Sequence, residues 1–268
     1  MIIFPTCKIN LGLHVLEKRS DGFHNLETVM VEIPWTDEIE FEEASSDALE
    51  IEGLEIQGND NLVTKALSIA RHHASIPPLK INLKKNIPMG AGLGGGSSDA
   101  AQFYRKLAQC FFPDRTISAL ETDISVIGSD CAFFIKGGIQ KCTGRGEILE
   151  PISLNLSGYH LVVVNPGIHI STAEAFRNIT PDKNRPSISE IIQYPIGKWR
   201  MHLKNDFEDS LFPIYPELEK IKSKLYEHGA VYAAMTGSGS TIFGIFNSLE
   251  NAEKITMASA KFLKRVSF

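Results

Sequence analysis

The sequence predicts an α+β fold divided between two domains, on the strength of three observations. The 268 residues include 43% hydrophobic side chains and carry a net charge of −5, which is typical of a globular protein long enough for two modest cores. A glycine cluster lies in each half of the chain, at 90–96 and at 237–239. Strand-like alternation and helix-like periodicity both occur in each half. We therefore expect domains over 1–150 and 151–268.

The N-terminal half mixes strands and helices. Alternating apolar residues predict strands within 2–15, at 28–33 and at 79–84. Helical spacing predicts helices over 61–73, with Asp60 or Asn61 as a candidate N-cap, and over 117–127. A further helix is expected from Ser97 and Ser98 onward, directly after the first glycine cluster. A strand therefore leads into these glycines and a helix leaves them.

The C-terminal half follows a turn-rich stretch at 151–158 and opens with an apolar strand at 161–164. Pro216 and Gly229 bound a predicted helix. Strands at 230–235 and 241–246 flank the second glycine cluster, and a last helix is expected over about 250–263. Segment 178–200 carries three prolines and little periodicity, so we expect a loop with freedom to move.

The composition also excludes several classes of protein. The acidic balance is unlike that of nucleic-acid binders, and the longest apolar runs are far shorter than a membrane span. The N-terminus lacks the basic-then-apolar pattern of a signal peptide. Four widely spaced cysteines favour reduced, mostly buried thiols over a disulfide framework. We expect a cytoplasmic protein that binds no nucleic acid and no membrane, and the oligomeric state stays open.

The first glycine cluster is a candidate phosphate-binding loop. Glycines let backbone N–H groups turn toward an anion, and the N-terminus of the following helix adds partial positive charge. A tight turn without a ligand is the structural alternative. A dinucleotide-binding loop requires a second strand with an acidic residue about 20 residues on, whereas 110–115 reads as a loop. A Walker A loop requires Lys where Gly96 stands, and the protein-kinase motifs are missing.

Three segments together resemble the motifs of the GHMP small-molecule kinases. Residues 88–101 resemble the phosphate-binding motif, 5–13 the N-terminal strand motif, and 236–240 the third motif. The resemblance covers nearly the whole chain in order. It implies an N-terminal domain like ribosomal protein S5 domain 2, a ferredoxin-like C-terminal α/β plait, ATP and Mg²⁺ as cofactors, and an active site between the domains.

The resemblance also implies the nucleotide contacts. ATP would be bound by the loop and the start of its helix, and the adenine would be approached by Asn61 and Leu62. The loop residues are Pro88, Met89, Gly90, Ala91, Gly92, Leu93, Gly94, Gly95, Gly96, Ser97 and Ser98. The two serines offer hydroxyls to a phosphate or its magnesium, or act as N-caps, and the sequence assigns no metal ligand. Gly237-Ser238-Gly239 would brace this loop, and a plain hairpin turn is its alternative.

Asp130 and Lys8 are the implied catalytic residues. Asp130 stands among small and apolar residues, where a buried carboxylate requires a cation or several donors. As a base it would accept the proton of the substrate hydroxyl, and Lys8 would be its electrostatic partner. The alternatives are a helix N-cap for Asp130 and a solvated lysine on an edge strand for Lys8.

The acceptor is implied by Lys8-x-Asn10 together with Asp21-Gly22-Phe23-His24, which is most similar to family members acting on a cytidine diphosphate sugar alcohol. Asn10 would contact this substrate, Phe23 and Phe176 would sandwich the base, and His24 would hydrogen-bond it. Phe23 stands where Tyr is more usual, and Phe176 is alternatively a helix core residue. A mevalonate- or homoserine-type kinase and a catalytically silent nucleotide-binding regulator remain as other possibilities.

Overall fold

The computed structural model describes residues 1–53 and 61–268, so Asp60 lies outside the described residues. The chain folds into two compact units. Unit 1 comprises Met1–Lys8, Pro34–Met89 and Gly94–Gly137, and unit 2 comprises Ile9–Ile33, Gly90–Leu93 and Gly138–Phe268. Each unit therefore draws on several stretches of chain, and the domain boundary near residue 150 stays a prediction.

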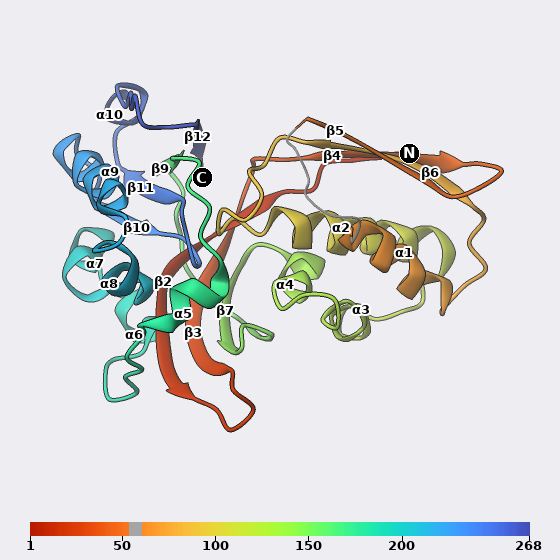
Figure 1. Ribbon diagram of the computed structural model, residues 1–268, viewed down its shortest axis with the longest axis horizontal. Helices are drawn as coiled ribbons and strands as arrows, with labels where there is room; N and C mark the ends of the chain where they lie inside the picture. The colour runs from red at the N-terminus through yellow and green to blue at the C-terminus, as the bar shows by residue number, and fades with distance from the viewer. Residues whose placement is uncertain (54–60) are drawn as a thin grey trace. The chain divides into compact units, whose positions relative to one another are not determined.

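Within its described residues, unit 1 combines one four-stranded sheet with four helices (Figure 1). The strands in spatial order are β1 (Ile2–Ile3), β4 (Glu38–Glu43), β6 (Leu79–Lys85) and β5 (Ala48–Gly53), of which only the β6–β5 pair is parallel. The helices are α1 (Leu62–Arg71), α2 (Gly95–Phe111), α3 (Ile117–Ile124) and α4 (Cys131–Lys136). Phe103 of α2 meets Phe41 of β4 edge to face, with ring centroids 5.1 Å apart. Helix α2 is therefore packed on the sheet that leads into the glycine cluster.

Unit 2 contains two four-stranded sheets (Figure 1). The first has the order β2 (Cys7–Lys18), β3 (His24–Ile33), β7 (Ile139–Gly144) and β8 (Ile148–Pro151); Cys7 and Lys8 of β2 are grouped with unit 1. The second has the order β10 (Tyr232–Met235), β11 (Ile242–Phe246), β9 (His160–Asn165) and β12 (Phe262–Ser267), with antiparallel neighbours throughout.

The helices and strands of unit 2 share one core. They are α5 (Thr172–Arg177), α6 (Ile188–Ile191), α7 (Ile196–His202), α8 (Phe207–Leu211), α9 (Pro216–Glu227) and α10 (Leu249–Glu253). Leu218, Ile221 and Leu225 form the apolar face of α9 and join Met235 and Phe246 in one buried cluster. This spacing of three and four residues is what predicted the helix from sequence.

Most predicted elements are confirmed within one to five residues at their ends, but the expected helix over 250–263 is wrong. Helix α10 ends at Glu253, and β12 follows as a strand antiparallel to β9. The buried residues 161–164 of β9 would leave backbone N–H and C=O groups unpaired along one edge without this partner. The need to pair β9 therefore outweighs the weak helical pattern of the tail.

The expected loop over 178–200 is also corrected, because α6 and α7 lie within it. Ser187 accepts a hydrogen bond from the backbone N–H of Glu190, whose side chain in turn accepts one from the N–H of Ser187. This capping box is readable in the sequence as Ser-x-x-Glu. Helix α7 is held by Trp199, which is fully buried and donates its ring N–H to the carbonyl of Tyr194 at 3.0 Å.

The cysteines behave as predicted: all four are free, with Cys110 exposed and Cys7, Cys131 and Cys142 buried. Burial raises the pKa of the Cys131 thiol to about 12, so this thiol stays protonated at neutral pH. None of the helices in the described part of the chain combines the length and the apolar character that crossing a bilayer requires.

Candidate active site

Lys8 and Asp130 form an ion pair in unit 1. The Nζ of Lys8 lies 3.5 Å from the Oδ2 of Asp130, with side chains 3% and 28% exposed. Asp130 occupies the N-cap position of α4 but makes no side-chain capping bond there. Lys8 is thus no solvated edge lysine, whereas the side chain of Asp130 is partly exposed to solvent. The pair can accept a proton and stabilise negative charge at one place.

The second part of the glycine cluster begins helix α2 in the same unit. Gly94 is the N-cap in the left-handed conformation, so Gly95 and Gly96 form the first turn and the expected serine N-cap is wrong. A Cβ added to Gly94 would lie 3.3 Å from the Cε of Lys8. Since the first N–H groups of a helix have no intrahelical acceptor, α2 offers donors to an anion beside the Lys8 side chain.

The two serines of this helix differ in accessibility. Ser98 is fully buried, and its hydroxyl accepts a hydrogen bond from Gln102 at 3.0 Å. Ser97 is half-buried and interacts with the thiol of Cys131. Ser97 is therefore the better placed of the two to meet a ligand.

Asn61 and Leu62 begin helix α1. The side chain of Asn61 accepts a hydrogen bond from the N–H of Val63 at 2.8 Å, so this residue is the N-cap that the sequence offered as the alternative to a nucleotide contact. The Cδ1 of Leu62 lies 3.9 Å from the position of a Cβ on Gly96, and outside the helix's own backbone it is the one contact within 4 Å among residues 1–53 and 61–268. Leu62 thus lies beside the first turn of α2.

The first part of the glycine cluster, 90–93, is held by the third motif within unit 2. The hydroxyl of Thr236 donates to the carbonyl of Gly92 at 3.0 Å. It also contacts the Oδ1 of Asn10 at 3.1 Å and accepts from the N–H of Asn10 at 3.0 Å. The 236–240 turn joins the antiparallel strands β10 and β11, so it is a hairpin and a brace at once. Asn10 is buried, and its side chain belongs to this network.

Asn205 stabilises the third motif by hydrogen bonds to its backbone. The sequence analysis did not identify this residue. Its Nδ2 donates to the carbonyls of Met235 and Gly237 at 2.7 and 2.9 Å. Its Oδ1 accepts from the N–H of Phe207 at 3.1 Å, at the start of α8. The one signal in the sequence is an Asn-Asp pair before a short apolar run, which is too common to single out.

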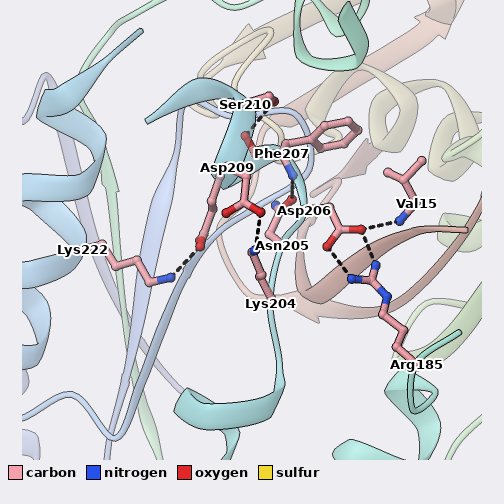
Figure 2. Close-up of polar contacts among 10 residues, drawn as sticks. Val15, Arg185, Lys204, Asn205, Asp206, Phe207, Asp209, Ser210 and Lys222 are labelled. Carbon is pink, nitrogen blue, oxygen red and sulfur yellow. Dashed lines mark hydrogen bonds and ion pairs between the residues drawn. The ribbon is translucent and has the colours of Figure 1, made fainter. Parts of the chain in front are cut away.

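The acidic residues that follow Asn205 each meet a separate cation (Figure 2). Asp206 pairs with Arg185 and accepts from the N–H of Val15 at 2.7 Å. Lys204 pairs with Asp209, and Lys222 contacts Glu208 at 2.5 Å. These bonds anchor α8 and Asn205, so the acidic run is a structural feature of unit 2.

The aromatic residues proposed for the cytidine lie in unit 2. His24 stacks on Phe176 with ring centroids 4.7 Å apart and planes inclined by 14°, and Phe207 meets Phe176 edge to face. Burial lowers the pKa of His24, so its ring is neutral at pH 7 and both donates and accepts hydrogen bonds. Phe23 is 55% exposed, and the guanidinium of Arg145 lies 5.1 Å from its ring centroid. The structure thus pairs Phe176 with His24, and Phe23 with Arg145.

A buried charge cluster of Asp37, Lys85 and Asp99 lies within unit 1 and was also missed. Asp99 was noted only as part of the loop motif, and Lys85 lies one residue beyond the predicted strand over 79–84. The antiparallel pairing of β4 and β6 brings Asp37 to Lys85, and helix α2 brings Asp99 to the same lysine.

Two family models match the chain. The model described as "GHMP kinases N terminal domain" matches residues 61–138, and that described as "GHMP kinases C terminal" matches 196–262. The 4-diphosphocytidyl-2-C-methyl-D-erythritol kinase of Bacteroides fragilis is 45% identical over 266 residues, covering 97% of both chains. The enzyme of the same name from Porphyromonas gingivalis is 45% identical, covering 95% of both.

Solved structures agree with these matches. The crystal structure of a 4-(cytidine 5'-diphospho)-2C-methyl-D-erythritol kinase is similar with a TM-score of 0.80 and 31% identity, covering 95% of this chain and 93% of that one. The L. major mevalonate kinase, at 18% identity and a TM-score of 0.68 over 99% and 94% of the two chains, shares the fold. The chain therefore belongs to the GHMP kinase family, with the two-part fold that its motifs implied.

Proposed function

We propose that this protein transfers the γ-phosphoryl group of ATP to the 2-hydroxyl of 4-diphosphocytidyl-2-C-methyl-D-erythritol, a step in non-mevalonate isoprenoid precursor synthesis. The observation that carries the proposal is the Lys8–Asp130 pair beside the start of α2. A chain 45% identical to kinases of this name over 97% of its length supports the choice of acceptor.

Asp130 and Lys8 have distinct roles in the proposed reaction. Asp130 receives the proton of the substrate hydroxyl while the hydroxyl oxygen bonds to the γ-phosphorus and the bond from that phosphorus to ADP breaks. Lys8 lies 3.5 Å from Asp130 and is almost fully buried. Its ammonium is therefore held in place to stabilise the charge that builds up on the transferred group, which is where such catalysis gains most.

The nucleotide would be held chiefly by the first turn of α2, whose N–H groups and helix dipole favour phosphate. Mg²⁺ neutralises charge on the phosphates when it is bound. Among the described residues no group of three or more His, Cys, Asp and Glu side chains could hold a metal ion. This fits a magnesium that is carried mainly by ATP oxygens and water, as is common for this ion.

The cytidine would be bound by unit 2. Phe176 offers a large aromatic face, on which the neutral ring of His24 stacks. Phe23 and Arg145 provide a second, exposed ring and a positive charge. We propose that these side chains rearrange around the base, with Phe176 as the stacking surface and His24 as the hydrogen-bonding partner.

The substrate assignment is tested by measuring ADP release with the cytidyl-erythritol substrate, mevalonate and homoserine in parallel. We expect turnover with the first alone, since the other two lack a base for Phe176 and His24. Equal activity on all three would contradict the assignment. ATP binding without turnover of any of them would favour a silent nucleotide-binding regulator.

Phe176→Ala tests the stacking role. We expect the KM for the cytidyl substrate to rise roughly tenfold, because stacking on a base contributes about 1–3 kcal/mol, while the KM for ATP stays the same. Phe212→Ala is the matched control, since Phe212 and Phe176 pack against the same core and only Phe176 is proposed to stack on the base. An unchanged KM for the cytidyl substrate in Phe176→Ala would remove Phe176 from the site.

A further inference from the structure

Three charged side chains are buried together beneath helix α2. Lys85, the last residue of β6, donates to Asp37 and to the Oδ2 of Asp99, the latter at 2.6 Å. Lys85 and Asp99 are each 2% exposed and Asp37 is fully buried. Two carboxylates thus face one ammonium, and with both ionised the cluster would carry an uncompensated negative charge out of water.

The two carboxyl groups are not equivalent. The carboxylate of Asp37 accepts hydrogen bonds from the backbone N–H groups of Asn86 and Ile87, the second at 2.8 Å. It also accepts a hydrogen bond from Lys85. The Oδ1 of Asp99 is buried and has no hydrogen-bond partner within residues 1–53 and 61–268. The Asp37 carboxylate thus has three hydrogen-bond donors and the Asp99 carboxylate has one, so a proton in the cluster is best accommodated on Asp99.

Asp99 gains or loses its proton at a pH near neutrality. Burial raises the pKa of Asp99 to about 7, with Asp37 adding to the rise and Lys85 opposing it. Lys85 and Asp37 are the charged groups that act on Asp99 from the neighbouring β6 strand and the turn before β4.

The cluster lies against the phosphate-binding end of α2. A Cβ on Gly95, the first residue of the helix, would be 3.5 Å from the Nζ of Lys85, and Asp99 is one turn further along. A buried negative charge at this position repels a phosphate bound at the helix N-terminus, because the protein interior screens charges poorly. When Asp99 is protonated, the positive charge of Lys85 balances the negative charge of Asp37, and the repulsion of the phosphate disappears.

We propose that Asp99 is a positioning residue that takes up a proton when nucleotide binds at the N-terminus of α2, so that nucleotide affinity falls as Asp99 ionises. The inference rests on the proposed function in one respect, the nucleotide at this helix. The proton leaves a hydronium ion or a buffer acid and forms an O–H bond with a carboxylate oxygen of Asp99, and no bond between heavy atoms changes.

The test is calorimetric binding of MgADP at pH 7.5 in two buffers that differ in ionisation enthalpy. We expect the wild-type protein to take up roughly half a proton per MgADP, the amount for a carboxyl whose pKa rises by about one unit from near 7. The Kd should rise about five- to tenfold between pH 6.5 and 8.5. Asp99→Asn, which keeps the shape and stays neutral, should bind MgADP with neither the uptake nor the pH dependence.

Glu121→Gln is the matched control, because the pKa of Glu121 is also raised by burial in unit 1 but the residue lies on α3. It should retain the wild-type proton uptake. MgADP binding without proton uptake in the wild-type protein would overturn the inference and leave the proposed function intact, whether or not Asp99→Asn folds. Absence of MgADP binding at every pH would overturn both.

Discussion

Asp130→Asn is expected to lower kcat by about 10²- to 10⁴-fold, the usual contribution of a general base, while the KM values for ATP and for the cytidyl substrate change only a few-fold. The substitution keeps the size of the side chain and removes the proton acceptor. Since Asp130 makes no capping bond in α4, folding should be little affected. Steady-state kinetics with both substrates varied, together with direct binding of each, measure the effect.

Asp114→Asn is the matched control for this variant. Asp114 is an exposed carboxylate of the same unit, in the turn between α2 and α3. The same chemical change there should leave kcat at the wild-type value. If Asp130→Asn turned over at nearly the wild-type rate, Asp130 would not be the base, and Lys8 alone would be left to act on the hydroxyl.

The site was predictable from sequence where its signal is local. The strand over 79–84, the glycines and the helix behind them follow one another along the chain, so their pattern predicts the loop without any tertiary contact. Lys8 and Asp130 are far apart in sequence, and it was the resemblance that joined them; the structure places them 3.5 Å apart. The site roles themselves stay predictions until the variants are measured.

Features that depend on distant packing were missed. Asn205 matters because its amide reaches the carbonyls of Met235 and Gly237, which no spacing reveals. Asp99 meets Lys85 only because β6 and α2 pack within one unit. The strand β12 likewise forms because β9 has an edge to pair, although its residues read weakly as helix. In each case a tertiary partner decides the outcome, and the partner is not a neighbour in sequence.

Gly92→Ala is expected to weaken ATP binding at least tenfold and to destabilise the fold by about 2–4 kcal/mol. Gly92 has a φ of +77°, and a Cβ there would lie 2.1 Å from the carbonyl oxygen of Thr236. That oxygen is backbone and cannot swing away, so either the loop or the third motif must move. Thermal melting and titration with MgADP measure the two effects.

Gly197→Ala is the control for the substitution itself, because Gly197 lies in α7 and the described part of the chain places no side chain or neighbouring element within 4 Å of its Cβ position. It should melt at or slightly above the wild-type temperature, as alanine favours helix. If Gly92→Ala melted and bound MgADP like the wild-type protein, the loop would tolerate displacement and the brace from Thr236 would not serve nucleotide binding.

Gly96→Ala is expected to lower nucleotide affinity without lowering the stability of the fold. Gly96 has no positive φ, and among the described residues its Cβ would meet only Leu62, at 3.9 Å. The protein without nucleotide should therefore accept this alanine and melt normally. A phosphate approaching the N–H groups of the first turn would meet the new methyl group, so MgADP affinity should fall tenfold or more. Normal melting with normal affinity would place the phosphates elsewhere. If Gly96→Ala lost MgADP affinity but melted normally, Gly96 would be needed for binding the anion. Gly92, whose substitution is expected to lower both stability and affinity, would by contrast be needed for the shape of the loop.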